Sequence, residues 1–256
     1  MSMKTSFKTE MIANKFEAYN DILEQTLGFR FVFQTFLSNP KITRVLDYGC
    51  GPGKVSYRLA KKTGVHVLAV DESKEMINIA SKKRSHPNIN YHLIKNDNLS
   101  FLKDNSVDGA MACYVFINTE KKEQILRMMK EIYRVLAPHS PFVILDTNPD
   151  STGIEFSTFR NGIKGKKYMS GEARQEWLHI NDQEDLVLHD FHWQKPVYEE
   201  LLTEAGFQEI EQLEPTLKDI PEDELKIIQE KHHDHHWKSE WEFPPFVIYK
   251  SIKLVK

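Results

Sequence analysis

Three glycines at alternate positions, Gly49, Gly51 and Gly53, follow closely after Asp47 at the end of an apolar, β-branched run. That run, residues 42–46, is typical of a buried parallel strand, and Gly53 begins an amphipathic helical pattern. Glycines at a strand-to-helix turn allow positive φ angles and let a ligand touch the main chain. The turn therefore predicts a ligand-binding loop at the N-terminus of a helix, where N–H groups are unpaired.

A dinucleotide-binding loop is one interpretation of these glycines. The Gly-x-Gly-x-x-Gly fingerprint, however, needs a glycine where this chain has Lys54. The spacing found here, with Asp47 in front of it, suits a ligand that has no pyrophosphate to place on the helix N-terminus. A nicotinamide-dependent dehydrogenase is therefore a disfavoured alternative.

Asp71 is the second acid at the end of an apolar run. It follows residues 65–70 and lies 20 positions after Gly51. This spacing places an acid at the ribose hydroxyls of a bound adenosine. A carboxylate offers two acceptor oxygens, so we expect a bidentate contact to two neighbouring hydroxyls.

The elements that must position these residues alternate along the chain. Five apolar runs predict parallel strands: residues 42–46, 65–70, 89–94, 107–113 and 141–146. Helical patterns separate them, the longest at 120–136, and a further helical pattern covers residues 9–38. Two last strands, 207–213 and 246–254, are expected as an antiparallel pair. The order predicts a doubly wound, seven-stranded α/β sheet with ligands at the carboxyl ends of its strands.

The whole chain, residues 1–256, is expected to form a single domain of four parts. They are an N-terminal helical cap (1–40), a cofactor-binding core (41–147), a lid insertion (148–193) and a C-terminal helix with a β-hairpin (194–256). The lid is expected to be a β-hairpin, because residues 173–180 and 185–191 alternate in polarity around Asn181-Asp182.

The phrase Val45-Leu-Asp-Tyr-Gly-Cys-Gly-Pro-Gly53 resembles motif I of the class I S-adenosylmethionine-dependent methyltransferases. Arg134-Val-Leu-Ala-Pro138 is similar to a second phrase of that family, Arg-Val-Leu-Lys-Pro. The resemblance implies a Rossmann-like sheet, S-adenosylmethionine as cofactor, S-adenosylhomocysteine as product, and in-line transfer of a methyl group.

The resemblance also implies where the cofactor binds. The glycine loop receives its amino acid part, Met76 packs on adenine, and an acid after the third strand bonds the adenine amino group. That acid matches Asp97, although Asn96 and Asn98 leave the register open. The expected cofactor residues are Tyr19, Asp47, Gly49, Cys50, Gly51, Gly53, Asp71, Glu72, Met76, Asp97, Asn98 and Cys113.

The methyl acceptor is expected near the end of the fourth strand, where Tyr114 and Asn118 follow Cys113. No Asn-Pro-Pro-Tyr or Asp-Pro-Pro-Tyr motif is present there, which disfavours nucleobase and glutamine methylation. Methyl transfer chiefly needs the two reactants held in line, so no catalytic signature is required. Candidate catalytic groups are Tyr114, His189 and His192, followed by Tyr168 and Asp146; His192 shares a strand face with Asp190 and could pair with it.

A narrower resemblance concerns N-methyltransferases of toxoflavin-like pathways. It rests on Phe16-Glu-Ala-Tyr19, Asn148-Pro-Asp150 and His192-Trp193 ahead of Tyr198. We therefore expect a nitrogen or oxygen atom of a small molecule as acceptor. A protein or RNA methyltransferase, and a non-catalytic module of the same fold, remain alternatives.

Composition and charge limit the classes of partner that the protein is expected to have. The net charge is −3 with acids and bases mixed, so no nucleic-acid partner is expected. The sequence contains no run of eighteen apolar residues, no apolar signal core and only two cysteines. These features predict a cytoplasmic protein without membrane contact. His232, His235 and His236 have helical metal-ligand spacing, yet no metal is expected in so polar a stretch. The sequence does not indicate an oligomeric state.

Overall fold

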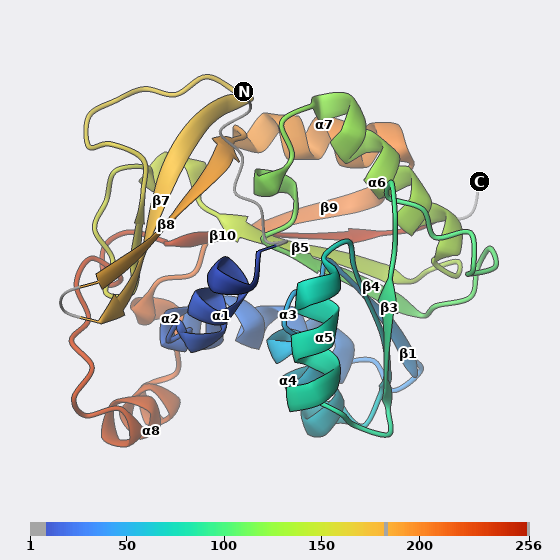
Figure 1. Ribbon diagram of the computed structural model, residues 1–256, viewed down its shortest axis with the longest axis horizontal. Helices are drawn as coiled ribbons and strands as arrows, with labels where there is room; N and C mark the ends of the chain where they lie inside the picture. The colour runs from blue at the N-terminus through green and yellow to red at the C-terminus, as the bar shows by residue number, and fades with distance from the viewer. Residues whose placement is uncertain (1–8, 182–183, 255–256) are drawn as a thin grey trace.

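The main sheet has seven strands and is doubly wound, as predicted (Figure 1). The computed structural model describes residues 9–181 and 184–254; the predicted turn at Asn181-Asp182 lies partly outside them. The strands, in spatial order, are β3 (Ile89–Leu93), β2 (His66–Asp71), β1 (Arg44–Tyr48), β4 (Gly109–Cys113), β5 (Pro141–Thr147), β10 (Phe246–Ile252) and β9 (Gln208–Leu213). β10 runs antiparallel to both neighbours, so the expected antiparallel pair of last strands is confirmed.

Helices cover both faces of this sheet because alternate strand residues point to opposite sides. On one face, Val45 and Val67 pack in a cluster with α3 (Arg30–Leu37) and α4 (Lys54–Thr63). On the other, Leu46 and Leu68 pack in a cluster with α6 (Lys122–Val135) and α7 (Lys195–Ala205). α5 (Lys74–Lys83) packs against β2 and β3. The central strands β1, β2, β4, β5 and β10 are buried on both sides, which explains their apolar runs, whereas the edge strands β3 and β9 are partly exposed.

The N-terminal segment is helical but not continuous, contrary to the unbroken pattern over residues 9–38. It consists of α1 (Glu10–Ala18), α2 (Ile22–Glu24), a π-helical turn η1 (Gln25–Phe29) and α3. The break falls at Tyr19, whose ψ of 133° is extended and whose side chain is buried. Tertiary contacts of that side chain, described below, override the local helical pattern.

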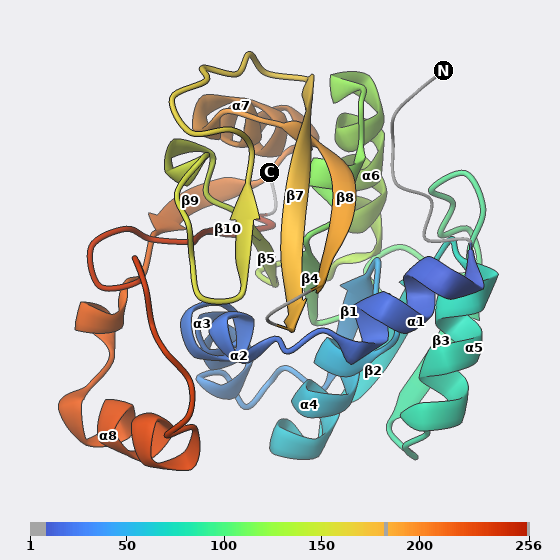
Figure 2. The ribbon, with the colours of Figure 1, turned by 60° about the vertical axis from the view of Figure 1, so that its left-hand side comes forward.

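A separate three-stranded antiparallel sheet lies between β5 and α7 in sequence. It contains β6 (Phe159–Asn161), β7 (Glu172–Asn181) and β8 (Glu184–His192). The predicted hairpin is thus confirmed as β7–β8, while β6 escaped prediction because three residues are too short to show alternation. Figure 2 shows the hairpin reaching down to the N-terminal helices, and Lys15 Nζ lies 2.6 Å from Glu184 Oε1 there.

The remaining elements are short. They are the 3₁₀ turns η2 (Phe116–Asn118), η3 (Pro149–Ser151) and η4 (Leu217–Asp219), and the helix α8 (Glu222–Lys231). Within the described ranges, no group of three or more His, Cys, Asp or Glu side chains could hold a metal ion. None of the described helices is long and apolar enough to cross a membrane.

Candidate active site

One cavity of about 560 Å³ lies at the carboxyl ends of β1, β2 and β4, where the sequence placed its ligand site. The N-terminal segment and the β7–β8 hairpin contribute to its walls. It is lined by the following residues from the expected cofactor set: Tyr19, Asp47, Gly49, Cys50, Gly51, Asp71, Glu72, Met76, Asp97 and Cys113. Residues from four strand ends and two further segments therefore meet at one place.

Gly53 and Asn98 do not line the cavity. Gly53 has a φ of 79°, and a Cβ there would lie 2.7 Å from the Tyr91 hydroxyl. Its role is to let the loop turn into α4 beside Tyr91. The Asn98 side chain accepts a hydrogen bond from the Ser100 N–H at 2.6 Å, which fixes a local turn. Of the three candidates after β3, Asn96, Asp97 and Asn98, Asp97 is the one that lines the cavity.

The glycine loop presents its backbone to the cavity. The N–H groups of Gly49 and Cys50 both donate to the Val70 carbonyl, at 2.8 and 2.9 Å, which ties the loop to β2. Gly51 has a φ of 51°, and a Cβ added there would meet nothing within 4 Å. The space above Gly51 is therefore open, and a ligand could approach its main chain closely.

Asp71 stands at the end of β2 beneath this loop. Its Oδ2 accepts the Gly51 N–H at 2.8 Å, and its Oδ1 accepts the Ser73 N–H at 2.7 Å. Burial raises the pKa of this carboxyl, with the two N–H donors acting in the opposite direction. Each oxygen keeps a further lone pair, so the group can still accept two ligand hydroxyls.

Asp97 is held in the left-handed region, with a φ of 59°. Gln124 Nε2 donates to its Oδ2 at 3.1 Å, and its own N–H donates to Glu72 Oε1 at 3.2 Å. Between Asp71 and Asp97, the Met76 side chain forms part of the apolar wall. The two acids can accept hydrogen bonds from ribose hydroxyls and an adenine amino group, and the methionine offers an apolar contact. These three side chains therefore fit the ribose and adenine of S-adenosylmethionine.

Asp47 lies inside the sheet edge rather than in solvent. It is 1% exposed and accepts a hydrogen bond from the Ser56 hydroxyl. Burial raises its pKa to about 7. Burial likewise raises the pKa of the Cys50 and Cys113 thiols well above the usual value, so both line the cavity as neutral thiols.

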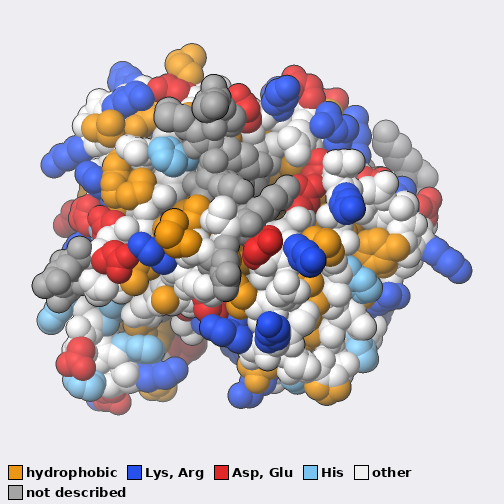
Figure 3. All heavy atoms as spheres, in the orientation of Figure 1, with side chains coloured by type: hydrophobic (Ala, Val, Ile, Leu, Met, Phe, Trp, Pro, Cys, Tyr) orange, Lys and Arg blue, Asp and Glu red, His pale blue; other side chains and the backbone are white. Residues whose placement is uncertain are grey.

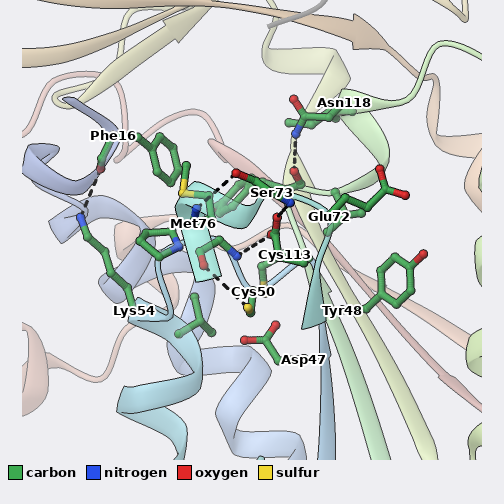
Figure 4. A pocket seen from close by; sticks show the side chains of 18 of the residues that line it. Phe16, Asp47, Tyr48, Cys50, Lys54, Glu72, Ser73, Met76, Cys113 and Asn118 are labelled. Atoms are coloured by element: carbon green, nitrogen blue, oxygen red, sulfur yellow. Dashed lines mark hydrogen bonds between the residues drawn. The ribbon is translucent and has the colours of Figure 1, made fainter. Parts of the chain in front are cut away.

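Lys54, the residue that departs from the dinucleotide fingerprint, holds the N-terminal segment in place (Figure 4). Its Nζ donates to the carbonyl of Tyr19 at 2.9 Å and lies 3.5 Å from that of Phe16. Both carbonyls belong to the last turn and the end of α1, where a cation is favourable. Lys54 thus links the glycine loop to the segment that covers the cavity.

Of the expected acceptor-side residues, Tyr114 and Asn118 line the cavity, and the Asn118 amide donates to the Tyr114 carbonyl at 2.6 Å. His189 and His192 do not line it, nor do Tyr168 and Asp146.

The expected pairing of His192 with Asp190 is wrong. Asp190 instead binds Arg174, whose Nη2 lies 3.0 Å from its Oδ2 with both side chains buried. Burial and the Arg174 charge lower the pKa of His192 to about 4.

Comparison with known proteins identifies the family. A family model described as "Methyltransferase domain" matches residues 45–139. N-demethylindolmycin N-methyltransferase of Streptomyces griseus is 35% identical over 190 residues, covering 73% of this chain and 80% of that protein. The chain belongs to the class I S-adenosylmethionine-dependent methyltransferases.

Other relatives of this methyltransferase differ in the atom they methylate. A ubiquinone/menaquinone biosynthesis C-methyltransferase, UbiE of Desulfotalea psychrophila, is 27% identical over 217 residues, covering 78% of this chain and 81% of that protein. Among solved structures, a SAM-dependent methyltransferase from Aquifex aeolicus superposes with a TM-score of 0.58 at 16% identity, covering 95% and 98% of the two chains. That likeness concerns the fold.

Several cavity residues of the methyltransferase escaped the sequence analysis. They are Asp21, Glu24 and Phe29 of the N-terminal segment, Gln124 of α6, Thr147 of β5, Glu176, Leu178 and Leu188 of the hairpin, and Phe246 of β10. The alternation of β7 puts Arg174, Glu176 and Leu178 on one face, and two charged residues beside Leu178 on that face were the available signal.

Proposed function

We propose that this methyltransferase transfers the methyl group to a nitrogen atom of a small molecule. The observation that carries the proposal is that one cavity of about 560 Å³ is lined both by most of the expected cofactor residues and by the acceptor-side residue Tyr114. Two lines support nitrogen as the target atom: the Streptomyces griseus relative is named as an N-methyltransferase, and the toxoflavin-pathway resemblance concerns N-methyltransferases.

In this proposal the residues at the β1–β3 side bind the cofactor. Asp71 would hold the ribose hydroxyls, Asp97 and Met76 the adenine, and the main chain at Gly49 and Gly51 the amino acid part. When bound, S-adenosylmethionine supplies a methyl group on a positively charged sulfur. The acceptor lone pair forms the new bond, while the electron pair of the broken C–S bond stays on sulfur.

Surface charge supports a small acceptor over a nucleic acid. Basic and acidic side chains are interspersed on the face shown in Figure 3, in keeping with the net charge of −3. A nucleic-acid backbone is normally met by a continuous basic area. A small acceptor also suits a cavity whose walls include the hairpin and the N-terminal segment.

Thermal unfolding tests the cofactor assignment. A ligand at one hundred times its dissociation constant adds about 2.7 kcal/mol, which for a domain of this size raises Tm by roughly 5–10 °C. We expect this shift with S-adenosylmethionine and S-adenosylhomocysteine and none with NAD. A Tm shift with NAD alone would instead support a nicotinamide-dependent dehydrogenase. No shift with any of the three ligands would favour a non-catalytic module of the same fold.

Transfer of a labelled methyl group tests the acceptor. Suitable acceptors are N-demethylindolmycin, a metabolite extract, total protein and total RNA, each offered with labelled cofactor. We expect label on small molecules and on nitrogen. Label confined to protein or RNA would contradict the proposal.

A further inference from the structure

We propose that Glu24, Glu176 and Tyr114 form a recognition site for a basic, N–H-bearing nitrogen next to an apolar group of the methyl acceptor. The inference rests on the proposed function and names the substrate class of the same cavity. All three residues line the same cavity: Glu24 comes from the N-terminal segment, Tyr114 follows β4, and Glu176 belongs to the hairpin.

Glu24 offers one free oxygen on this side. The side chain is 6% exposed and comes from α2, next to the break at Tyr19. Its Oε1 accepts the Tyr19 hydroxyl at 2.6 Å, and that hydroxyl also lies 2.9 Å from Thr158 Oγ1. Its Oε2 has no hydrogen-bond partner among the residues that the structure describes. A buried carboxyl oxygen without a donor is costly, and a ligand N–H would satisfy it.

Glu176 provides a second carboxyl from β7. It is 7% exposed and lines the same cavity. Burial and the negative charges of Asp190 and Glu24 raise its pKa, while the positive charge of Arg174 acts in the opposite direction. Within the described part of the chain, no hydrogen bond to its carboxyl is recorded. Two carboxyls in one apolar cavity do not both ionise without a counter-charge, and a ligand cation would supply it.

Tyr114 adds a buried hydroxyl that also lacks a partner in the described ranges. Its φ of 58° is rare for a bulky residue and costs about 1–3 kcal/mol of the kind that collects at functional sites. The ring contacts Phe29 and Phe246 edge-on, with centroids 6.3 and 5.7 Å away. Burial and the Glu24 carboxyl raise the pKa of Tyr114 well above the usual value, so its hydroxyl stays a donor and acceptor.

The chemistry of these groups selects the acceptor. The aromatic rings and Leu178 and Leu188 suit an apolar ring or chain, and the two carboxyls suit an ammonium or N–H donor beside it. A neutral alcohol of the same shape would bring no positive charge to either carboxyl. The nitrogen must lose its ammonium proton before its lone pair can form the bond to methyl, and a Glu24 carboxylate that has ionised on binding the ammonium can accept that proton.

Binding to the complex with S-adenosylhomocysteine tests the inference without turnover. The probes are pairs with one skeleton, such as benzylamine and benzyl alcohol, 2-phenylethylamine and 2-phenylethanol, and tryptamine and tryptophol. Calorimetry should show at least one amine binding about 10- to 100-fold more tightly than its alcohol, the range for a hydrogen bond to a charged group. No amine exceeding its alcohol would overturn the inference.

Conservative variants assign the effect to the two carboxyls. Glu24→Gln and Glu176→Gln should each reduce the amine preference about tenfold or more, with S-adenosylhomocysteine affinity unchanged within about twofold. Glu230→Gln, an exposed position on α8, is the matched control and should change neither. An amine preference that survives in both cavity variants would overturn the assignment.

The two proposals fail in distinguishable ways. If labelled methyl reaches nitrogen but neither variant alters amine binding, the N-methyl function stands and the recognition site is rejected. If amines bind as expected but label reaches only oxygen or carbon atoms, the recognition site stands and the N-methyl function is rejected.

Discussion

Asp71 joins the second strand to the glycine loop, since its Oδ2 accepts the Gly51 N–H at 2.8 Å. The same carboxyl accepts the Ser73 N–H that begins α5. The Asp71 side chain therefore fixes the position of the loop and the start of α5, and it also offers two oxygens to the cavity. A substitution here affects both the shape of the site and its hydrogen-bonding capacity.

Asp71→Ala should weaken S-adenosylmethionine binding about 30- to 150-fold, because roughly 2–3 kcal/mol is lost when two hydroxyls lose their acceptors. Asp71→Asn keeps one acceptor oxygen, so its affinity for S-adenosylmethionine should fall between those of Asp71→Ala and the wild type. Isothermal calorimetry measures both. A loss under about twofold in Asp71→Ala would show that Asp71 is not the ribose ligand.

Lys54→Met should loosen the N-terminal segment. It removes a charge-assisted hydrogen bond to the Tyr19 carbonyl and should lower the free energy of unfolding by about 1–3 kcal/mol. Amide hydrogen exchange over residues 10–24 should accelerate at the same time. Lys62→Met, an exposed position on the same helix, is the control. Equal exchange in the two variants would contradict the linking role of Lys54.

Glu24 should make the protein less stable at alkaline pH. Burial raises its pKa from 4.5 to about 8, while Tyr19 and Lys54 lower it and Asp21 raises it further. Between these values the folded protein holds a proton that the unfolded chain has lost. The contribution of Glu24 to the free energy of unfolding is therefore fully present below pH about 4.5 and is lost as pH rises through about 8.

Urea unfolding of the wild type and Glu24→Gln at pH 6 and pH 9 measures this effect. The amide cannot ionise, so the wild type should lose at least about 1 kcal/mol more than the variant over this interval. Parallel pH profiles would contradict the raised pKa.

Arg174→Met should destabilise the protein by about 3–5 kcal/mol, because it leaves the buried Asp190 carboxyl without its cation. The variant also breaks the bond from Arg174 to Thr147 Oγ1, which joins the hairpin to β5. Urea unfolding measures the loss. The double variant Arg174→Met/Asp190→Leu should recover much of it, whereas additive losses would show that the pair does not act as a unit.

The sequence alone determined the parts of this methyltransferase that follow from local pattern. Apolar runs and helical periodicities repeat at short range, so they predicted the seven strands, their succession along the chain and the β7–β8 hairpin. The glycine loop and Asp71 were predicted from residue types and spacing, and Asp97 from the family resemblance. Gly49, Gly51, Asp71 and Asp97 line one cavity because strand ends of a parallel sheet meet at one edge. Short elements such as β6 and the break at Tyr19 carry too little periodicity to be detected.

Only the tertiary structure decided the acceptor side of the cavity. Glu24 and Glu176 are 152 positions apart in sequence, and no spacing rule relates them. They meet because the hairpin packs on the N-terminal segment, through contacts such as that between Lys15 and Glu184. Asp190 pairs with Arg174 rather than His192 because the register of the β7–β8 hairpin places Arg174 directly opposite it. A strand pattern gives the face of a residue but not its partner on that face.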